Sequence, residues 1–134
     1  MNPSIHHIAI VVRDLDAALA LYRDTLGLEM TERRKAPEEG VEIAFLPAGD
    51  GDIELLCPMD AESGVARFLE KRGEGLHHVC LAVEDVEAAM ERLRESGGQL
   101  LSEEPRVNEH GTRYVFVHPK STHGVLLELY ETAE

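Results

Sequence analysis

The chain contains the same pattern twice, and this duplication limits the folds that it can adopt. Residues 5–12 read IHHIAIVV and residues 76–83 read LHHVCLAV. Each run is followed by an Asp, a pair of alanines and a Gly at matching places, and His7 and His78 lie 71 residues apart. A duplication that carries a histidine at the same point in each copy predicts two half-sites around one ligand or metal.

Each copy has the pattern of one strand, one helix and three further strands. In the first copy we expect strands and a helix at 5–12, 14–26, 28–35, 41–47 and 52–57. In the second copy we expect them at 76–83, 85–96, 99–103, 112–118 and 124–130. The sequence therefore predicts an α+β fold made of two paired βαβββ modules.

The length of 134 residues suits one domain with a real core. We expect a single domain over 1–134, with the first module at about 4–58 and the second at about 75–131. A connecting helix is expected at about 63–72, between the two modules. No low-complexity segment or flexible linker divides them.

Charge and cysteine usage narrow the class of protein. The formal net charge of −13 argues against nucleic-acid binding, because recognition of phosphates needs a concentrated basic surface. No apolar run approaches the ~20 residues that span a bilayer, so no membrane is expected as a partner. Cys57 and Cys80 lack CxxC spacing and each sits in an apolar run, which predicts free buried thiols. We expect a soluble cytoplasmic protein.

Strand alternation selects one histidine in each copy, because successive side chains point to opposite faces. His7 shares its face with Ala9, and His78 shares its face with Cys80 and Ala82. These small side chains leave room for a ligand on that face. His6 and His77, which directly precede these two histidines, fall on the opposite face, among the larger apolar side chains. There we expect them to be exposed or to cap a strand edge.

Two glutamates interrupt apolar strands, and they too occupy matching positions in the two copies of the repeat. Glu54 and Glu128 lie 74 residues apart, close to the histidine offset. An ionised carboxylate buried without a partner is very costly, so each needs a cation, a hydrogen-bond network or a raised pKa. Together with His7 and His78 they would give two imidazoles and two carboxylates, which suits Co, Ni, Zn, Mn or Fe(II). Any one of these residues alone is ordinary, whereas two repeat-related pairs favour a metal site.

Three stretches carry a resemblance to a known family that covers the whole chain: GEGLHHV at 73–79, EEP at 103–105 and HPKSTHGVLLEL at 118–129. In these stretches the chain resembles the methylmalonyl-CoA epimerases of the vicinal oxygen chelate superfamily. The resemblance implies a cup-shaped mixed sheet around a divalent metal, cobalt first, with Zn, Ni or Mn as alternatives. The family pattern places metal ligands at His7, His78 and Glu128, and a Gln or Glu at position 54.

The resemblance also implies a reaction: epimerisation of an acyl-CoA, methylmalonyl-CoA, by removal of the α-proton through a metal-stabilised enediolate. Such a reaction needs a base on each face of the planar intermediate. Glu128 is one candidate. For the other, the family's position aligns with Ile43, and Glu42 fits only if one residue is deleted, which would turn the side chain to the opposite face. Glu54 is the alternative second base.

Other parts of the chain suggest how a substrate is held. Ser121 and Thr122 lie in a turn before the strand of Glu128, where hydroxyl and N–H groups could bind the substrate carboxylate. Basic residues could attract CoA phosphates, although no single one is assigned: Arg33, Arg34 and Lys35 in the first module, and Arg67, Lys71 and Arg72 in the connecting helix. The resemblance also implies a homodimer.

Alternative functions remain open at this level. Two His and two Glu also look like glyoxalase I, a lactoylglutathione lyase whose reaction again moves a proton. A ring-cleaving dioxygenase with Fe(II) is a further alternative. A metal-free binding module is a third, although no Trp, three Phe and three Tyr give little material for an aromatic cage.

Overall fold

The structure is a computed structural model, and it describes residues 3–132. The chain divides into two compact units. One unit is residues 7–77, and the other contains the described residues before 7 and after 77. The division falls between the two consecutive histidines of each repeat.

The first module contains β1 and the elements that follow it up to β4, and α2 comes next. These are β1 (Ser4–Val11), α1 (Leu15–Leu19), η1 (Ala20–Thr25), β2 (Glu32–Ala36), β3 (Val41–Ala48), β4 (Gly51–Pro58) and α2 (Gly64–Arg72). The strand order is β2-β3-β4-β1, and β1 runs parallel to β4 while the other neighbours are antiparallel.

The second module repeats this topology. Its elements are β5 (Gly75–Val83), α3 (Val86–Glu95), β6 (Arg106–Val107), β7 (Arg113–Val117), η2 (Pro119–Ser121) and β8 (Leu127–Glu131). The order is β6-β7-β8-β5, with β5 parallel to β8. The two modules therefore have the same strand order and the same single parallel pair, which confirms the predicted βαβββ duplication.

Matching aspartates start the first helix of each module. The Asp14 carboxylate accepts a hydrogen bond from the N–H of Ala17 at 3.2 Å, and Asp85 accepts one from Ala88 at 3.1 Å. Each supplies an acceptor to an N–H that has no partner within the helix. The helical turns that begin after Asp14 end at Thr25 with Leu26 as C-cap, in agreement with the helix expected at 14–26, and Gly27 follows with a φ of +86°. Among the described residues, no helix is long and apolar enough to cross a membrane.

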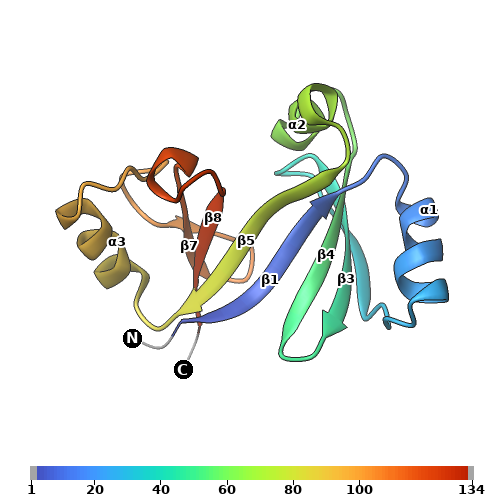
Figure 1. Cartoon of the computed structure of the whole chain (residues 1–134), viewed down its shortest axis with the longest axis horizontal. Coiled ribbons are helices and arrows are strands. Elements are labelled where there is room, and N and C mark those ends of the chain that lie inside the picture. The colour runs from blue at the N-terminus through green and yellow to red at the C-terminus, as the bar shows by residue number, and fades with distance from the viewer. Residues whose placement is uncertain (1–2, 133–134) are drawn as a thin grey trace. The chain divides into compact units, whose positions relative to one another are not determined.

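In each module a helix covers one face of the strands, as the figure shows for α1 beside β3 and β4 (Figure 1). Leu15 and Leu19 of α1 pack with Leu55 of β4 in one apolar cluster. Met90 of α3 packs with Val115 of β7 in the corresponding cluster of the second module. The opposite face of the first module, which carries Ala9 and Val11 of β1, packs against Val65, Phe68 and Leu69 of α2.

Two expectations about strands are wrong. Residues 99–103 do not form a strand, and the strand expected to start at 28 starts at Glu32. Residues 99–101 pair with β7 only through an isolated bridge between Leu100 and Val117, in which the N–H of Leu101 donates to the carbonyl of Phe116 and the N–H of His118 donates to that of Gln99, both at 2.9 Å. After this bridge, side chains bind the backbone: Arg94 donates to the carbonyl of Glu103 at 2.5 Å, and Ser102 donates to that of Glu104 at 2.7 Å. Such local bonds compete with a strand ladder, and the proline that follows has no N–H to donate.

Cys57 and Cys80 are free thiols, as predicted. Cys80 is fully buried, and Cys57 is half-buried. Burial raises the pKa of the Cys57 thiol, because the charged thiolate loses hydration. The Cys57 thiol is therefore a poor nucleophile in the folded chain.

Candidate metal and active site

The first module places a histidine and a glutamate side by side on β1 and β4. Glu54 has Ala9 as its Cα partner across the parallel pair, and Ala9 shares a face with His7, two residues earlier. The Nδ1 atom of His7 lies 3.2 Å from Oε2 of Glu54, and the two side chains are 6% and 12% exposed. The predicted pair therefore forms, and it is shielded from water.

The second module builds the same pair on β5 and β8. The Cα partner of Glu128 is Cys80, which again lies two residues after the histidine. The Nε2 atom of His78 lies 3.1 Å from Oε1 of Glu128, with side chains 8% and 9% exposed. Residues that are mates in the sequence repeat are thus mates in the structure, because both modules use the same parallel register.

The chemistry of each pair fits a divalent cation. Burial removes water from the carboxylate, so the charge needs a partner inside the protein. An imidazole nitrogen and a carboxylate oxygen stand in contact in each pair, and these are the donor types that borderline divalent metals accept. The residues present therefore suit the metal that the sequence predicted, while the donor types do not distinguish cobalt from zinc, nickel or manganese.

Glu42 lies apart from the His7 pair. It follows Val41 on β3, so it points to the face opposite Val41 and Ile43, and its carboxylate accepts a hydrogen bond from Nε of Arg33 at 3.0 Å. Ile43 is buried with Ala9 and Val11, on the face of the histidine. The structure brings Glu54 and His7 together and directs Glu42 away from them, as a one-residue shift in a strand requires.

Arg33 holds Glu42 in that position from a neighbouring strand. Its Nη1 atom donates to Asp16 of α1 at 2.7 Å while its Nε atom donates to Glu42. The Asp16 and Glu42 carboxylates raise the pKa of Arg33 further above its ordinary value. Glu42 is therefore part of an ion-pair network on the helix-covered face of the first module.

Ser121 and Thr122 belong to the turn around η2, and both hydroxyls help to shape it. The N–H of Gln99 donates to Oγ of Ser121 at 2.8 Å. The Thr122 hydroxyl contacts the carbonyl oxygens of Pro119 and Val125. The Ser121 hydroxyl proton has no acceptor among residues 3–132, whereas the Thr122 hydroxyl bonds within the turn.

Sequence reasoning missed an aromatic cluster on the face of His78. The rings of Phe116 and His78 meet edge to face, with centroids 5.3 Å apart, and Tyr114 meets Phe116 in the same way at 6.2 Å. The signal was the alternation of β7, where the aromatic residues occupy every second position between buried valines. Their place beside His78 was not evident from the sequence, because alternation within β7 alone does not tell which face of the sheet its aromatic residues occupy.

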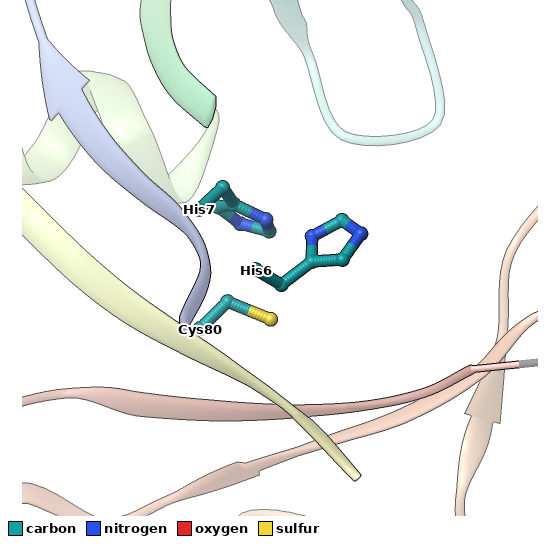
Figure 2. A group of neighbouring side chains, drawn as sticks. All are labelled: His6, His7 and Cys80. Atoms are coloured by element: carbon teal, nitrogen blue, oxygen red, sulfur yellow. The ribbon is translucent and has the colours of Figure 1, made fainter. Parts of the chain in front are cut away.

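His6 also differs from its predicted edge-capping or exposed role. It is half-buried, and its ring lies 4.5 Å from that of Tyr130, centroid to centroid. An imidazole nitrogen of His6 lies within 4.8 Å of the sulfur of Cys80, and Figure 2 shows both side chains together with His7, the next residue on β1. Tertiary packing therefore draws His6 toward the aromatic face of the second module.

Comparison with known proteins gives the family. The model of the Glyoxalase/Bleomycin resistance protein/Dioxygenase superfamily matches residues 6–116. The ethylmalonyl-CoA/methylmalonyl-CoA epimerase of Cereibacter sphaeroides is 45% identical over 127 residues, which cover 93% of this chain and 95% of that protein. The chain belongs to the methylmalonyl-CoA epimerase family.

Two further relatives support the family assignment. The mitochondrial methylmalonyl-CoA epimerase of Homo sapiens is 40% identical over 126 residues, which cover 93% of this chain and 72% of that protein. A single-residue variant of Streptomyces coelicolor methylmalonyl-CoA epimerase, solved in complex with 2-nitronate-propionyl-CoA, matches with a TM-score of 0.88 and 39% identity. That comparison covers 97% of this chain and 94% of the other, so the paired βαβββ fold is that of the family.

Proposed function

We propose that this chain is an epimerase that interconverts the two epimers of methylmalonyl-CoA by removing and returning the α-proton. The observation that carries the proposal is the pair of repeat-related, buried His–Glu contacts in a chain 45% identical to an epimerase of this substrate class. The glyoxalase I alternative is not favoured, because the relatives that are 45% and 40% identical to this chain are epimerases. Fold alone does not distinguish the two reactions.

His7, Glu54, His78 and Glu128 are proposed to hold one divalent metal ion, with cobalt preferred over zinc, nickel or manganese. When bound, such an ion supplies positive charge to the oxygens of the substrate, which lowers the energy of the enolate. Each module contributes one nitrogen and one oxygen donor from a buried pair. The internal duplication supports a shared site, since neither pair alone completes the coordination of such an ion.

Glu128 is proposed as one of the two bases. A carboxylate oxygen of Glu128 takes the α-proton, the electron pair of the C–H bond moves toward the thioester carbonyl, and the carbon becomes planar. The Nε2 atom of His78 lies 3.1 Å from Oε1, so the backbone register of β5 and β8 places the imidazole and the carboxylate beside one another. A base that is already positioned in this way needs less rearrangement in the transition state.

Glu54 is proposed as the second base, which returns a proton to the opposite face of the planar carbon. Two observations support Glu54 over Glu42. Glu54 is buried against His7, whereas Glu42 lies on the other face of β3 in contact with Arg33. Ile43 occupies the position where the resemblance placed a base, and a hydrocarbon side chain transfers no proton.

The remaining parts of the proposal concern binding and assembly. The Ser121 hydroxyl is proposed to donate to the substrate carboxylate, with the Thr122 backbone completing the turn. A homodimer is proposed because Leu21 and Leu26 of the first helix region are 49% and 60% exposed, and an interface would cover them. A cytoplasmic location is proposed from the two free thiols.

The test is exchange of the α-proton of racemic methylmalonyl-CoA in deuterated water, followed by NMR. Enzyme stripped of metal should be inactive, and Co(II) should restore exchange. Glu128→Gln should abolish it, whereas the matched change Glu42→Gln should retain it. Formation of lactoylglutathione from the hemithioacetal of glutathione and methylglyoxal, with no exchange of the CoA ester, would replace the epimerase assignment with glyoxalase I.

A further inference from the structure

The second module has one apolar face and one aromatic, polar face. Val115, Val117 and Leu129 of its central strands pack under α3. Alternation places Phe116 and Glu128 on the other face, where they are Cα partners across β7 and β8. The helix of this module therefore covers the face without the functional pair.

The two modules differ in what surrounds the His–Glu pair. Ile43 and Leu56 of the first module are buried beside Val65 of α2. Their mates 71 and 74 residues later are Tyr114 and Tyr130, which are only half-buried. The duplication has thus kept the pair in both modules while replacing aliphatic neighbours by aromatic ones in the second.

One neighbour of the pair has not been replaced. Phe45 is the Cα partner of Glu54, and its mate Phe116 is the Cα partner of Glu128. Phe45 packs against the apolar cluster under α2, and its ring lies 5.0 Å from the guanidinium carbon of Arg34. Phe116 instead contacts the ring of His78 and remains half-buried.

These positions constrain whatever carbon Glu128 deprotonates. The side chains that flank Glu128 across the strands are Phe116 on one side and Cys80 on the other. Cys80 is 0% exposed, so it offers no surface to a ligand, whereas part of Phe116 is accessible. Of these two cross-strand neighbours, only Phe116 can meet a substituent on an α-carbon that lies at the Glu128 carboxylate.

We propose that Phe116 is the specificity-determining residue that limits the size of the α-substituent of the acyl group. The inference rests on the proposed function and deepens it. The Phe116 ring lies against the His78 ring, with centroids 5.3 Å apart, so each further methylene on the substrate would have to displace the phenyl ring or lose contact with Glu128. A methyl group is tolerated, and longer alkyl groups are disfavoured.

The experiment compares kcat/KM for methylmalonyl-, ethylmalonyl- and propylmalonyl-CoA, each measured by α-proton exchange. Phe116→Ala should raise the propylmalonyl-to-methylmalonyl ratio by about 10-fold or more, the scale of discrimination for one or two methylenes in an apolar site. Phe116→Leu keeps more apolar volume, which guards against loss of folding, and should shift the ratio in the same direction by a smaller factor.

Phe45→Ala is the matched control, because this residue has the same register relation to Glu54 but lies in the apolar cluster of the first module. It should lower stability and leave the substrate ratio unchanged. Unchanged ratios in folded Phe116→Ala and Phe116→Leu would overturn the proposal, as would an equal shift in Phe45→Ala. Absence of exchange by the wild-type chain with all three esters would instead refute the proposed function. Co(II) binding measured by visible absorption checks that the variants retain the His78–Glu128 pair.

Discussion

Glu131, at the end of β8, joins three elements of the second module, and its substitution makes a quantitative prediction. Its Oε1 accepts from Nε of Arg113 at 2.9 Å, and its Oε2 accepts from Nη2 of Arg113 and from the N–H of Val86, both at 2.9 Å. The Val86 N–H lies at the start of α3, where a negative charge is also favoured by the helix dipole. One carboxylate therefore fixes β7, β8 and α3 together.

The expected cost of Glu131→Gln is about 2 kcal/mol in the free energy of unfolding. Bonds to charged groups contribute about 1.5 to 3 kcal/mol each when well shielded. The Glu131 side chain is 20% exposed, which weakens these bonds, and a glutamine oxygen in the place of Oε2 can still accept two of the three, without the negative charge. For a chain of this size, 2 kcal/mol corresponds to a fall in Tm of roughly 5 to 10 °C.

The pH dependence follows from the same contacts. The hydrogen bond from Arg113 holds the pKa of Glu131 below its ordinary value of 4.5. A carboxylate with a lowered folded-state pKa adds stability above its unfolded pKa, and this contribution is lost as the pH falls through the folded value. The difference in unfolding free energy between wild type and Glu131→Gln should therefore be full at pH 7 and should shrink below about pH 4.

Urea unfolding of the wild type and the variant at pH 7 and at pH 3.5, followed by circular dichroism, measures both effects. The matched control is Glu87→Gln, which removes a carboxylate that contacts the same guanidinium at 3.0 Å but is 61% exposed. Its effect should be clearly smaller. Equal losses in the two variants, or a loss at Glu131 that does not change with pH, would refute the reasoning.

Two further predictions concern the repeated features of the modules. Asp14→Ala and Asp85→Ala should each lower the unfolding free energy by about 1 kcal/mol, because each removes a helix N-cap. Urea unfolding measures this loss, and an unchanged free energy in either variant would contradict the prediction. His78→Ala should weaken Co(II) binding by more than about 100-fold, beyond the effect of losing a residue that only supports a ligand. Calorimetric titration checks this, and wild-type affinity in the variant would remove His78 from the proposed metal site.

The sequence by itself determined the features that repeat. The alternation of each first strand placed His7 and His78 on the faces that became buried, and the matched offsets paired them with Glu54 and Glu128. The helix caps were equally readable, because an N-cap is formed within four consecutive residues. Such features depend on local geometry and on the regular period of a strand, both of which are present in the order of the residues.

Only the tertiary structure decided the features that depend on a distant partner. Glu42 is directed away from the His7 pair by the register of β3 and by Arg33, on a different strand. His6 is drawn against Tyr130, more than a hundred residues away in the chain. A strand pattern shows which side chains share a face, whereas pairing register and helix packing decide which face is buried and by what. Those choices are made by contacts between segments far apart in sequence, and no local pattern contains them.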